Sequence, residues 1–262
     1  MMISVIVPVY NSQDHIKQCL DSILNQDYDN FELIVVNDGS TDDTLEILNL
    51  YKEKHDNLKV INISNHGQGF ARNLAITKST GEYILFVDSD DYIKENCLEI
   101  ISTVALKTNA DIINFNYVIK ELDGSIIKKS NFTDVGKKTI EGDCSILLSN
   151  RYYFSVNNLY NKKFINKNNI KFGEGYIYED YEFWLKSSIC SKKVVLLNDF
   201  LYVIVKNKNS STKVNLDTNK HAEDFIKAVN SCFYVINQHD FNNENNLNYF
   251  YKYIFNRFFM YY

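Results

Sequence analysis

The sequence has no excess of positive charge. Across 262 residues, 28 Lys and Arg stand against 33 Asp and Glu, which gives a net charge of −5 and a pI near 5.6. A protein that binds nucleic acid usually carries a strongly basic domain, because it must neutralise phosphates. The composition therefore argues against nucleic acid as a partner.

The sequence also lacks the marks of export and of a membrane span. Its cysteines are odd in number and form no C-x-x-C pair or zinc spacing, so we expect reduced, mostly buried thiols at Cys19, Cys97, Cys144, Cys190 and Cys232. No basic leader precedes the apolar run Ile3–Val9, and no stretch of about 18 apolar residues occurs. These absences predict a cytoplasmic setting, with contact at the cytoplasmic face of the inner membrane left open.

Short apolar runs alternate with segments of helical periodicity in the first part of the chain. The runs are rich in Val and Ile, as in strands that are covered on both faces: Ile3–Val9, Phe31–Val36, Leu58–Ile63 and Tyr83–Val87. Helical faces lie between them, for example Ile16, Cys19, Leu20 and Ile23. The alternation predicts βαβ units, and hence an α/β, Rossmann-like fold with a mostly parallel central sheet flanked by helices.

The remainder has a mixed pattern. We expect helices near Glu95–Lys107 and Asp180–Ser188, and a helical segment from about Asn215 to the end. Expected strands are Ile112–Glu121, which ends in the turn Asp123-Gly124, then Val194–Leu197 and Leu201–Val205.

Polar residues follow three of the expected strands at the points where they end. Tyr10 and Asn11 follow the first, the block from Asn37 to Asp42, which contains Asp38, follows the second, and Asp88-Ser89-Asp90-Asp91 follows the fourth. In open α/β sheets ligands bind beyond the carboxyl ends of the strands. Two carboxylates at i and i+2 suit Mg²⁺ or Mn²⁺ that also binds phosphate. The alternative is that Asp90 or Asp91 caps a helix that begins near Lys94.

Four sequence blocks resemble glycosyltransferase family 2. They are SVIVPVYN, VVNDGSTD, the N-x-G-x-x-x-ARN block from Asn65 to Asn73, and GEYILFVDSDD, and together they cover residues 1–92. The resemblance implies a GT-A fold, a nucleoside-diphosphate sugar as donor, inversion at the anomeric carbon, and Mn²⁺ or Mg²⁺ as cofactor.

The resemblance also implies roles for individual residues. Tyr10 would lie against the base, Asp38 would accept a hydrogen bond from its imide, which favours UDP, and Asp88 would reach the ribose. Asp90 would bind the metal. The full set at the nucleotide is Pro8, Tyr10, Asn11, Asp38, Gly67, Arg72 and Asp88.

Each of these residues has a plainer explanation. Tyr10 is compatible with an ordinary aromatic residue at a strand end, and Asp38-Gly39 with a simple turn. Asp42 is a suitable helix cap, and Arg72 would suit a surface ion pair of little energetic value.

The segment from Tyr178 to Lys186 resembles the Glu-Asp motif of the family, at the start of a helix beside the acceptor site. By that match Asp180 would take the proton from the acceptor hydroxyl, and Glu179 would position it or bind the acceptor. The alternative is that Asp180 is an acid in the first helical turn, where the helix dipole favours it. Gly173 and Gly175 predict a flexible loop nearby.

One departure from the family pattern follows Leu201-Tyr202. Val205 stands where a basic residue is expected, with Lys206 and Lys208 beyond it. These two lysines are the candidates for a contact with the diphosphate.

The resemblance implies the domain organisation and the activity. A GT-A catalytic domain would cover residues 1–214, with a nucleotide-binding half (1–92) and an acceptor-binding half (93–214). The residue pattern itself predicts a helical segment over 215–262, and because Tyr262 falls inside an aromatic pattern, we expect a longer natural chain to continue it. Its aromatic stretch 245–262 would dock on the domain, on a second copy or on a membrane surface.

The implied activity is transfer of a sugar to a glycan or lipid-linked glycan in bacterial surface polysaccharide synthesis. The alternatives are a nucleotide-sugar-binding module without turnover and a sugar-phosphate nucleotidyltransferase. The second would need a Gly-rich loop followed by Arg after Val9, and the sequence has none there.

Overall fold

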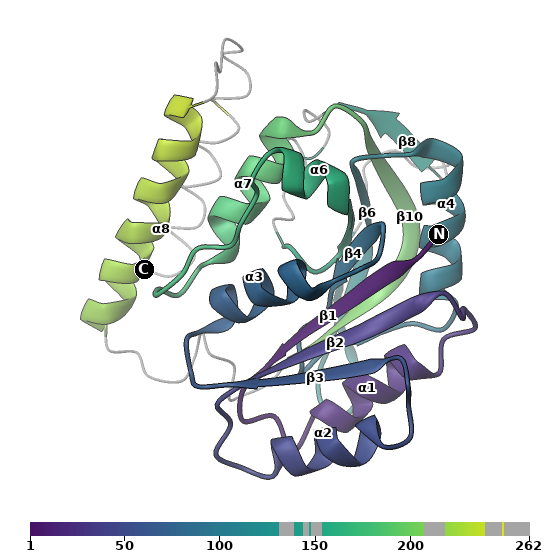
Figure 1. Cartoon of the computed structure of the whole chain (residues 1–262). Helices are drawn as coiled ribbons and strands as arrows, with labels where there is room; N and C mark the ends of the chain where they lie inside the picture. Colours follow the sequence, from purple (N-terminus) through teal and green to yellow (C-terminus); the bar gives the residue numbers. More distant parts are fainter. Residues whose placement is uncertain (131–138, 144–146, 148–153, 207–217, 239–247, 249–262) are drawn as a thin grey trace.

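A computed structural model of the chain describes residues 1–130, 139–143, 147, 154–206, 218–238 and 248. Its centre is a ten-stranded sheet in the order β3-β2-β1-β4-β9-β6-β10-β5, with β7 beside β6 and β8 beside β10 (Figure 1). The strands are β1 Ile3–Val9, β2 Phe31–Asp38, β3 Leu58–Ile63, β4 Tyr83–Phe86, β5 Tyr92–Ile93, β6 Ile112–Lys120, β7 Ile126–Lys129, β8 Thr139–Gly142, β9 Asn158–Asn161 and β10 Val194–Val205.

The first half is the predicted parallel sheet. Strands β3, β2, β1 and β4 run parallel, and every residue of β1 and β2 is buried, because helices cover both faces. The connecting helices are α1 Ile16–Leu24, α2 Thr44–Lys52 and α3 Gln68–Lys78. The α/β prediction from the apolar runs is therefore confirmed.

The second half joins this sheet in mixed orientation. The short strand β9 is antiparallel to both β4 and β6, whereas β6 and β10 are parallel to each other. The two strands expected at Val194–Leu197 and Leu201–Val205 are one continuous strand, β10, with register shifts between Leu197, Phe200 and Tyr202. Among the described residues of this half, the helices with defined bounds are α4 Cys97–Thr108, α6 Lys162–Lys167, α7 Asp180–Cys190 and α8 Thr218–Gln238.

Helix α8 belongs to a second apolar cluster, separate from the core around the sheet. It packs on the outer side of α7 through Tyr181, Trp184 and Leu185 of α7 and Phe225 and Cys232 of its own (Figure 1). The carboxylate of Asp224 accepts the backbone N–H of Ile177 at 3.2 Å. Helix α8 therefore helps to fix the segment that leads into α7.

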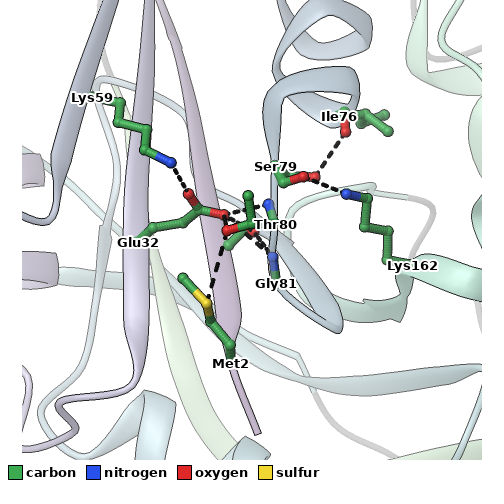
Figure 2. Close-up of polar contacts among 9 residues, drawn as sticks. Met2, Glu32, Lys59, Ile76, Ser79, Thr80, Gly81 and Lys162 are labelled. Atoms are coloured by element: carbon green, nitrogen blue, oxygen red, sulfur yellow. Dashed lines mark hydrogen bonds and ion pairs between the residues drawn. The ribbon is translucent and has the colours of Figure 1, made fainter.

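A buried carboxylate ties together the amino-terminal edge of the parallel strands. Figure 2 shows Glu32 of β2 bound to Lys59 of β3 at 2.6 Å and to the hydroxyl of Thr80, just before β4, at 2.7 Å. Ser4 of β1 also donates to Glu32, at 2.7 Å. Although burial raises the pKa of the Glu32 carboxyl, the bonds from Lys59, Ser4 and Thr80 lower it to about 2.

Several expectations fall outside the described residues. These are the placement of Lys208, of Cys144 and of nearly all of the aromatic stretch 245–262, within which only Asn248 is described. Within the part of the chain that is described, no helix is both long and apolar enough to cross a bilayer.

Candidate functional site

The carboxyl ends of β1, β2 and β4 lie side by side at one edge of the sheet. Parallel pairing sets Val9 opposite Asn37, and Ile6 opposite Phe86, so the residues that follow each strand meet at this edge. Tyr10 is 47% exposed there. The side-chain oxygen of Asn11 accepts the backbone N–H of Thr41 at 2.8 Å, which fixes the loop after β1 to the loop after β2. The predicted convergence of these loops is confirmed.

Asp38 is buried and already has two backbone partners. Its two carboxylate oxygens accept the N–H groups of His66 and Gly67 at 2.7 and 2.8 Å. Gly67 precedes α3 with a φ of +89°, a conformation that favours glycine. An ionised carboxylate has about four acceptor positions, so these two bonds leave room for a donor from a ligand. Asp38 thus fixes the start of α3 and keeps capacity for a further partner.

Arg72 of α3 connects the two halves of the sequence. Its guanidinium, only 3% exposed, donates to Asp88 at 2.7 Å and to Glu179 at 2.6 Å. It also lies over the ring of Phe172, with 5.1 Å between the guanidinium carbon and the ring centroid. Burial alone would lower the pKa of Arg72, but the charges of Asp88 and Glu179 raise it. The alternative of a surface ion pair is wrong, because the Arg72 side chain is buried.

The acidic residues after β4 have different environments. Burial, followed by the charge of Asp88, raises the pKa of Asp90 to about 6. Asp91 is buried and accepts the Tyr202 hydroxyl at 2.8 Å and the Val205 backbone N–H at 2.9 Å. Burial, with the charges of Asp90 and Asp88, also raises the pKa of Asp91. Helix α4 begins at Cys97, so the interpretation of Asp90 or Asp91 as its cap is wrong.

These environments leave Asp90 as the carboxylate best suited to a metal. Asp88 is bound to Arg72 and Asp91 to β10, and no group of three or more His, Cys, Asp or Glu is arranged to hold an ion among the residues described. Mg²⁺ is commonly held by one or two carboxylates together with substrate phosphates. A crowded carboxylate with a raised pKa gains from a neighbouring cation. The residues therefore fit an ion that is shared with a bound diphosphate, not one held by the protein alone.

Glu179 and Asp180 lie where α7 begins. The Gly173 backbone N–H donates to the Glu179 carbonyl at 2.9 Å, and the Glu179 side chain binds Arg72. Asp180 is half-buried in the first turn, and its charge contributes to the raised pKa of the buried Tyr160 hydroxyl, after burial itself. The position also agrees with a first-turn acid that the helix dipole favours, so the role of Asp180 as base stays a prediction.

The backbone just before this pair is strained. Tyr178 has a φ of +72°, which is uncommon for a bulky residue. Contacts with Tyr181 and Phe225, and a 3.3 Å approach of its hydroxyl to His221, hold it there. Such strain persists where the surroundings enforce it, and it concentrates at functional sites.

Gly173 is packed against Tyr176 and Gly69, which gives this glycine a steric role besides the predicted loop flexibility.

The departure at Val205 has a structural counterpart. The backbone N–H of Val205 donates a hydrogen bond to the carboxylate of Asp91, one of the acidic residues after β4. Lys206 forms an exposed ion pair with Glu121 at 3.0 Å, so its contact with a diphosphate remains a prediction.

Sequence reasoning missed two contributors to the site. The Tyr202 hydroxyl donates to Asp91 and accepts the Asp88 backbone N–H at 3.1 Å. The charge of His15, just before α1, acts on Asp90 and lowers its pKa against the larger raising effects. Tyr202 belongs to the Leu201-Tyr202 pair, and this pair was the signal in the sequence that could have identified Tyr202 as part of the site.

Comparison with known proteins agrees with this geometry. The profile of the family described as "Glycosyl transferase family 2" matches residues 4–168. A poly(ribitol-phosphate) beta-glucosyltransferase of Bacillus spizizenii is 35% identical over 79% of this chain and 32% of its own length. Glycosyltransferase GlyG of Streptococcus pneumoniae is 30% identical over 88% of this chain and 80% of its own length.

Solved structures extend the likeness to the fold. Residues 1–349 of S. aureus TarS in complex with UDP-GlcNAc match with a TM-score of 0.74 and 29% identity, over 88% of this chain and 66% of the other. The same fragment with UDP gives a TM-score of 0.78 and 28% identity over 97% of this chain and 71% of the other. The chain spans about a third of the length of the Bacillus relative. The matching profile, the relatives and the shared GT-A architecture establish that this chain belongs to glycosyl transferase family 2.

Proposed function

We propose that the chain transfers a sugar from a UDP-sugar, with inversion, to a hydroxyl of a bacterial surface polymer. The Arg72 bridge is the observation that carries this proposal. It joins Asp88, at the edge predicted for the nucleotide, to Glu179, beside the predicted base, through contacts of 2.7 and 2.6 Å. A transferase must hold donor and acceptor together in line, and this bridge brings the residues proposed for each into one site.

The donor would occupy the edge formed by the loops after β1, β2 and β4. Tyr10, half exposed, offers a ring face to the base, and Asp38 offers its remaining acceptor positions to the imide of uracil. Asp88 is 34% exposed although it binds Arg72, so it retains a surface for the ribose. Asp90 would hold Mn²⁺ or Mg²⁺, which would neutralise the diphosphate as it leaves.

The acceptor would bind beside α7. Asp180 would take the proton from the attacking hydroxyl, on the side of the sugar opposite to the diphosphate. Glu179 is held by Arg72 and would orient the acceptor or Asp180. UDP-GlcNAc and poly(ribitol-phosphate), which appear in the names of the relatives, are the first donor and acceptor to test.

The cysteines support a reducing, cytoplasmic location as part of this proposal. Cys19, Cys97 and Cys232 are buried free thiols, and burial is the main cause of the raised pKa of each. Contact with the cytoplasmic face of the membrane would follow from a lipid-linked acceptor.

The test is release of UDP from UDP-sugars with Mn²⁺, with and without acceptor, for the wild type and Asp180→Asn. We expect the variant to lose at least about 100-fold in kcat, as removal of a general base does, while calorimetry shows unchanged UDP binding. Exposed Asp56→Asn, just before β3 at the opposite edge of the sheet, is the matched control and should retain full activity. UDP binding by the wild type without any turnover would instead identify a binding module.

A further inference from the structure

A hollow lies between α3 and the segment that leads from α6 towards α7. Its volume is about 370 Å³, which falls within the rough range of small-ligand pockets, 300–1,000 Å³. We call it the α3 trough. It is formed by α3 on one side and by the segment from α6 towards α7 on the other, and its lining residues are Phe70, Asn73, Leu74, Ile76, Thr77, Ile165, Asn166, Asn169, Ile170, Lys171 and Glu174.

Hydrogen bonds hold the two walls of the trough together. The side chain of Asn73 accepts the backbone N–H of Phe172 at 2.9 Å and donates to the Phe172 carbonyl at 3.0 Å. It also donates to the carboxylate of Glu174 at 2.8 Å. On the far wall, Lys186 of α7 donates to the Asn169 carbonyl at 3.0 Å. The trough therefore exists before any ligand binds, which lowers the cost of binding.

The chemistry of the lining suits a hydroxyl-rich carbon skeleton. Ile76, Ile165 and Ile170 are buried and form an apolar floor. Exposed amide and hydroxyl groups of Asn166, Asn169 and Thr77 surround it. A sugar or polyol presents C–H groups to an apolar surface and hydroxyls to such donors and acceptors.

The charge of the lining disfavours an anion as the occupant. Lys171 and Glu174 contribute one charge of each sign, and both are exposed. The Glu174 carboxylate accepts a hydrogen bond from Asn73 and keeps further acceptor positions. A phosphate would meet this carboxylate as well as the lysine, whereas an uncharged hydroxyl can use both.

The trough is linked directly to the proposed catalytic residues. Neighbouring residues of α3 serve the two sites, since Arg72 binds Glu179 on the inner side and Asn73 shapes the trough on the outer side. On the opposite wall, Gly173 precedes Glu174 and donates its backbone N–H to the Glu179 carbonyl at 2.9 Å. The wall of the trough and the start of α7 are therefore joined by a direct backbone hydrogen bond.

We propose that the α3 trough binds an uncharged, hydroxyl-bearing unit of the acceptor polymer, remote from the hydroxyl that reacts. This inference rests on the proposed function, because it assigns a further subsite to the same acceptor. It predicts that the enzyme holds more than the terminal unit of its acceptor.

The test compares two tryptophan substitutions at the end of α3. Thr77→Trp places a large side chain in the trough, whereas Lys78→Trp adds the same bulk at the next position, which is exposed and outside the lining. Side-chain amide NMR signals of Asn166 and Asn169 in the full chain report binding. The probes are chitotriose, a ribitol-phosphate oligomer and inorganic phosphate, each titrated to millimolar concentration.

We expect chitotriose, which carries no charge, to shift these signals in the wild type and in Lys78→Trp, and to do so more strongly than the anionic ribitol-phosphate oligomer. Thr77→Trp should weaken that binding at least about tenfold, which corresponds to about 1.4 kcal/mol. UDP binding should be equal in all three proteins. No shift with either oligomer, equal binding by Thr77→Trp, or an equal shift with inorganic phosphate alone would overturn the subsite. If the wild type does not bind UDP at all, the proposed function itself is refuted.

Discussion

Carboxylates at the two edges of the parallel sheet have opposite electrostatic environments. At the amino-terminal edge, Glu32 lies among donors and a lysine, which hold its pKa at about 2 (Figure 2). At the carboxyl-terminal edge, Asp90 lies beside other carboxylates, and burial with the charge of Asp88 raises its pKa to about 6. The first edge has its charge compensated within the fold. At the second edge Arg72 compensates Asp88, but Asp90 stays beside like charges that raise its pKa, and a cation could relieve this repulsion.

Substitution of Asp90 should give the largest effect and separate activity from stability. Asp90→Asn removes the carboxylate proposed to hold the metal, so we expect kcat to fall at least about 100-fold. The free energy of unfolding should stay equal or rise, because one of several crowded negative charges is lost. Kinetics and urea unfolding measure the two effects.

Calorimetry of UDP binding with and without Mn²⁺ provides the control for this variant. The metal should strengthen UDP binding by the wild type but not by Asp90→Asn. Equal enhancement in both proteins would show that Asp90 does not hold the ion.

Substitution of Glu32 should do the reverse. Glu32→Gln leaves the donors of Ser4, Thr80 and Lys59 without a charged acceptor, so we expect the free energy of unfolding at pH 7 to fall by about 2 kcal/mol. Activity should be unchanged, since Glu32 lies at the opposite edge of the sheet. Urea unfolding and the UDP-release assay measure the two properties. A loss of kcat without a loss of stability would break the contrast between the edges.

The effect of Glu32 should depend on pH in a defined direction. The folded-state pKa of Glu32 is lowered from its usual 4.5 to about 2. Its stabilisation is therefore complete above the unfolded value and is lost as the pH falls towards the folded value. The difference in unfolding free energy between wild type and Glu32→Gln should shrink steadily below pH 4.5.

Lys59 is half exposed, so Lys59→Met should lower the free energy of unfolding by less, about 1 kcal/mol or under.

The sequence predicted the parallel half of the sheet better than it predicted the second half of the fold. Strands β1 to β4 were found because their apolar runs are buried on both faces. Strand β9 was missed because two of its four residues are asparagines, one of which, Asn158, is buried and paired with Asn114 at 2.7 Å. Strand β10 was divided because Asn198 and Asp199 interrupt its apolar residues. A side-chain bond from Asn116 to Asn198, at 3.0 Å, links it to β6 at that point.

The candidate site was predicted as residues, but its connections were not. The motif blocks identified Arg72, Asp88 and Glu179 separately. The bridge that joins them spans 107 positions between Arg72 and Glu179, a separation at which no local spacing carries information. The same holds for Tyr202 and Asp91, which are 111 positions apart. Contacts of this kind depend on sheet order, and the order β4-β9-β6-β10 could not be derived from the pattern of the second half.

Tyr202 supports two of the acidic residues at the carboxyl-terminal edge, and its removal should affect activity far less than the loss of Asp90. Tyr202→Phe deletes the donor to Asp91 and the acceptor of the Asp88 N–H while it preserves the buried ring. We expect a loss of about 1–2 kcal/mol in unfolding free energy, as for a buried hydrogen bond. If the hydroxyl only stabilises β10, kcat and the Mn²⁺ concentration for half-maximal activity will not change. We expect the Mn²⁺ concentration for half-maximal activity to rise several-fold. The reason is that Asp91 and the backbone of Asp88, which flank Asp90, both lose their hydrogen bond to the Tyr202 hydroxyl. Leu201→Ala, a neighbouring buried position whose side chain makes no polar contact with these acids, should lower stability without this shift in metal dependence.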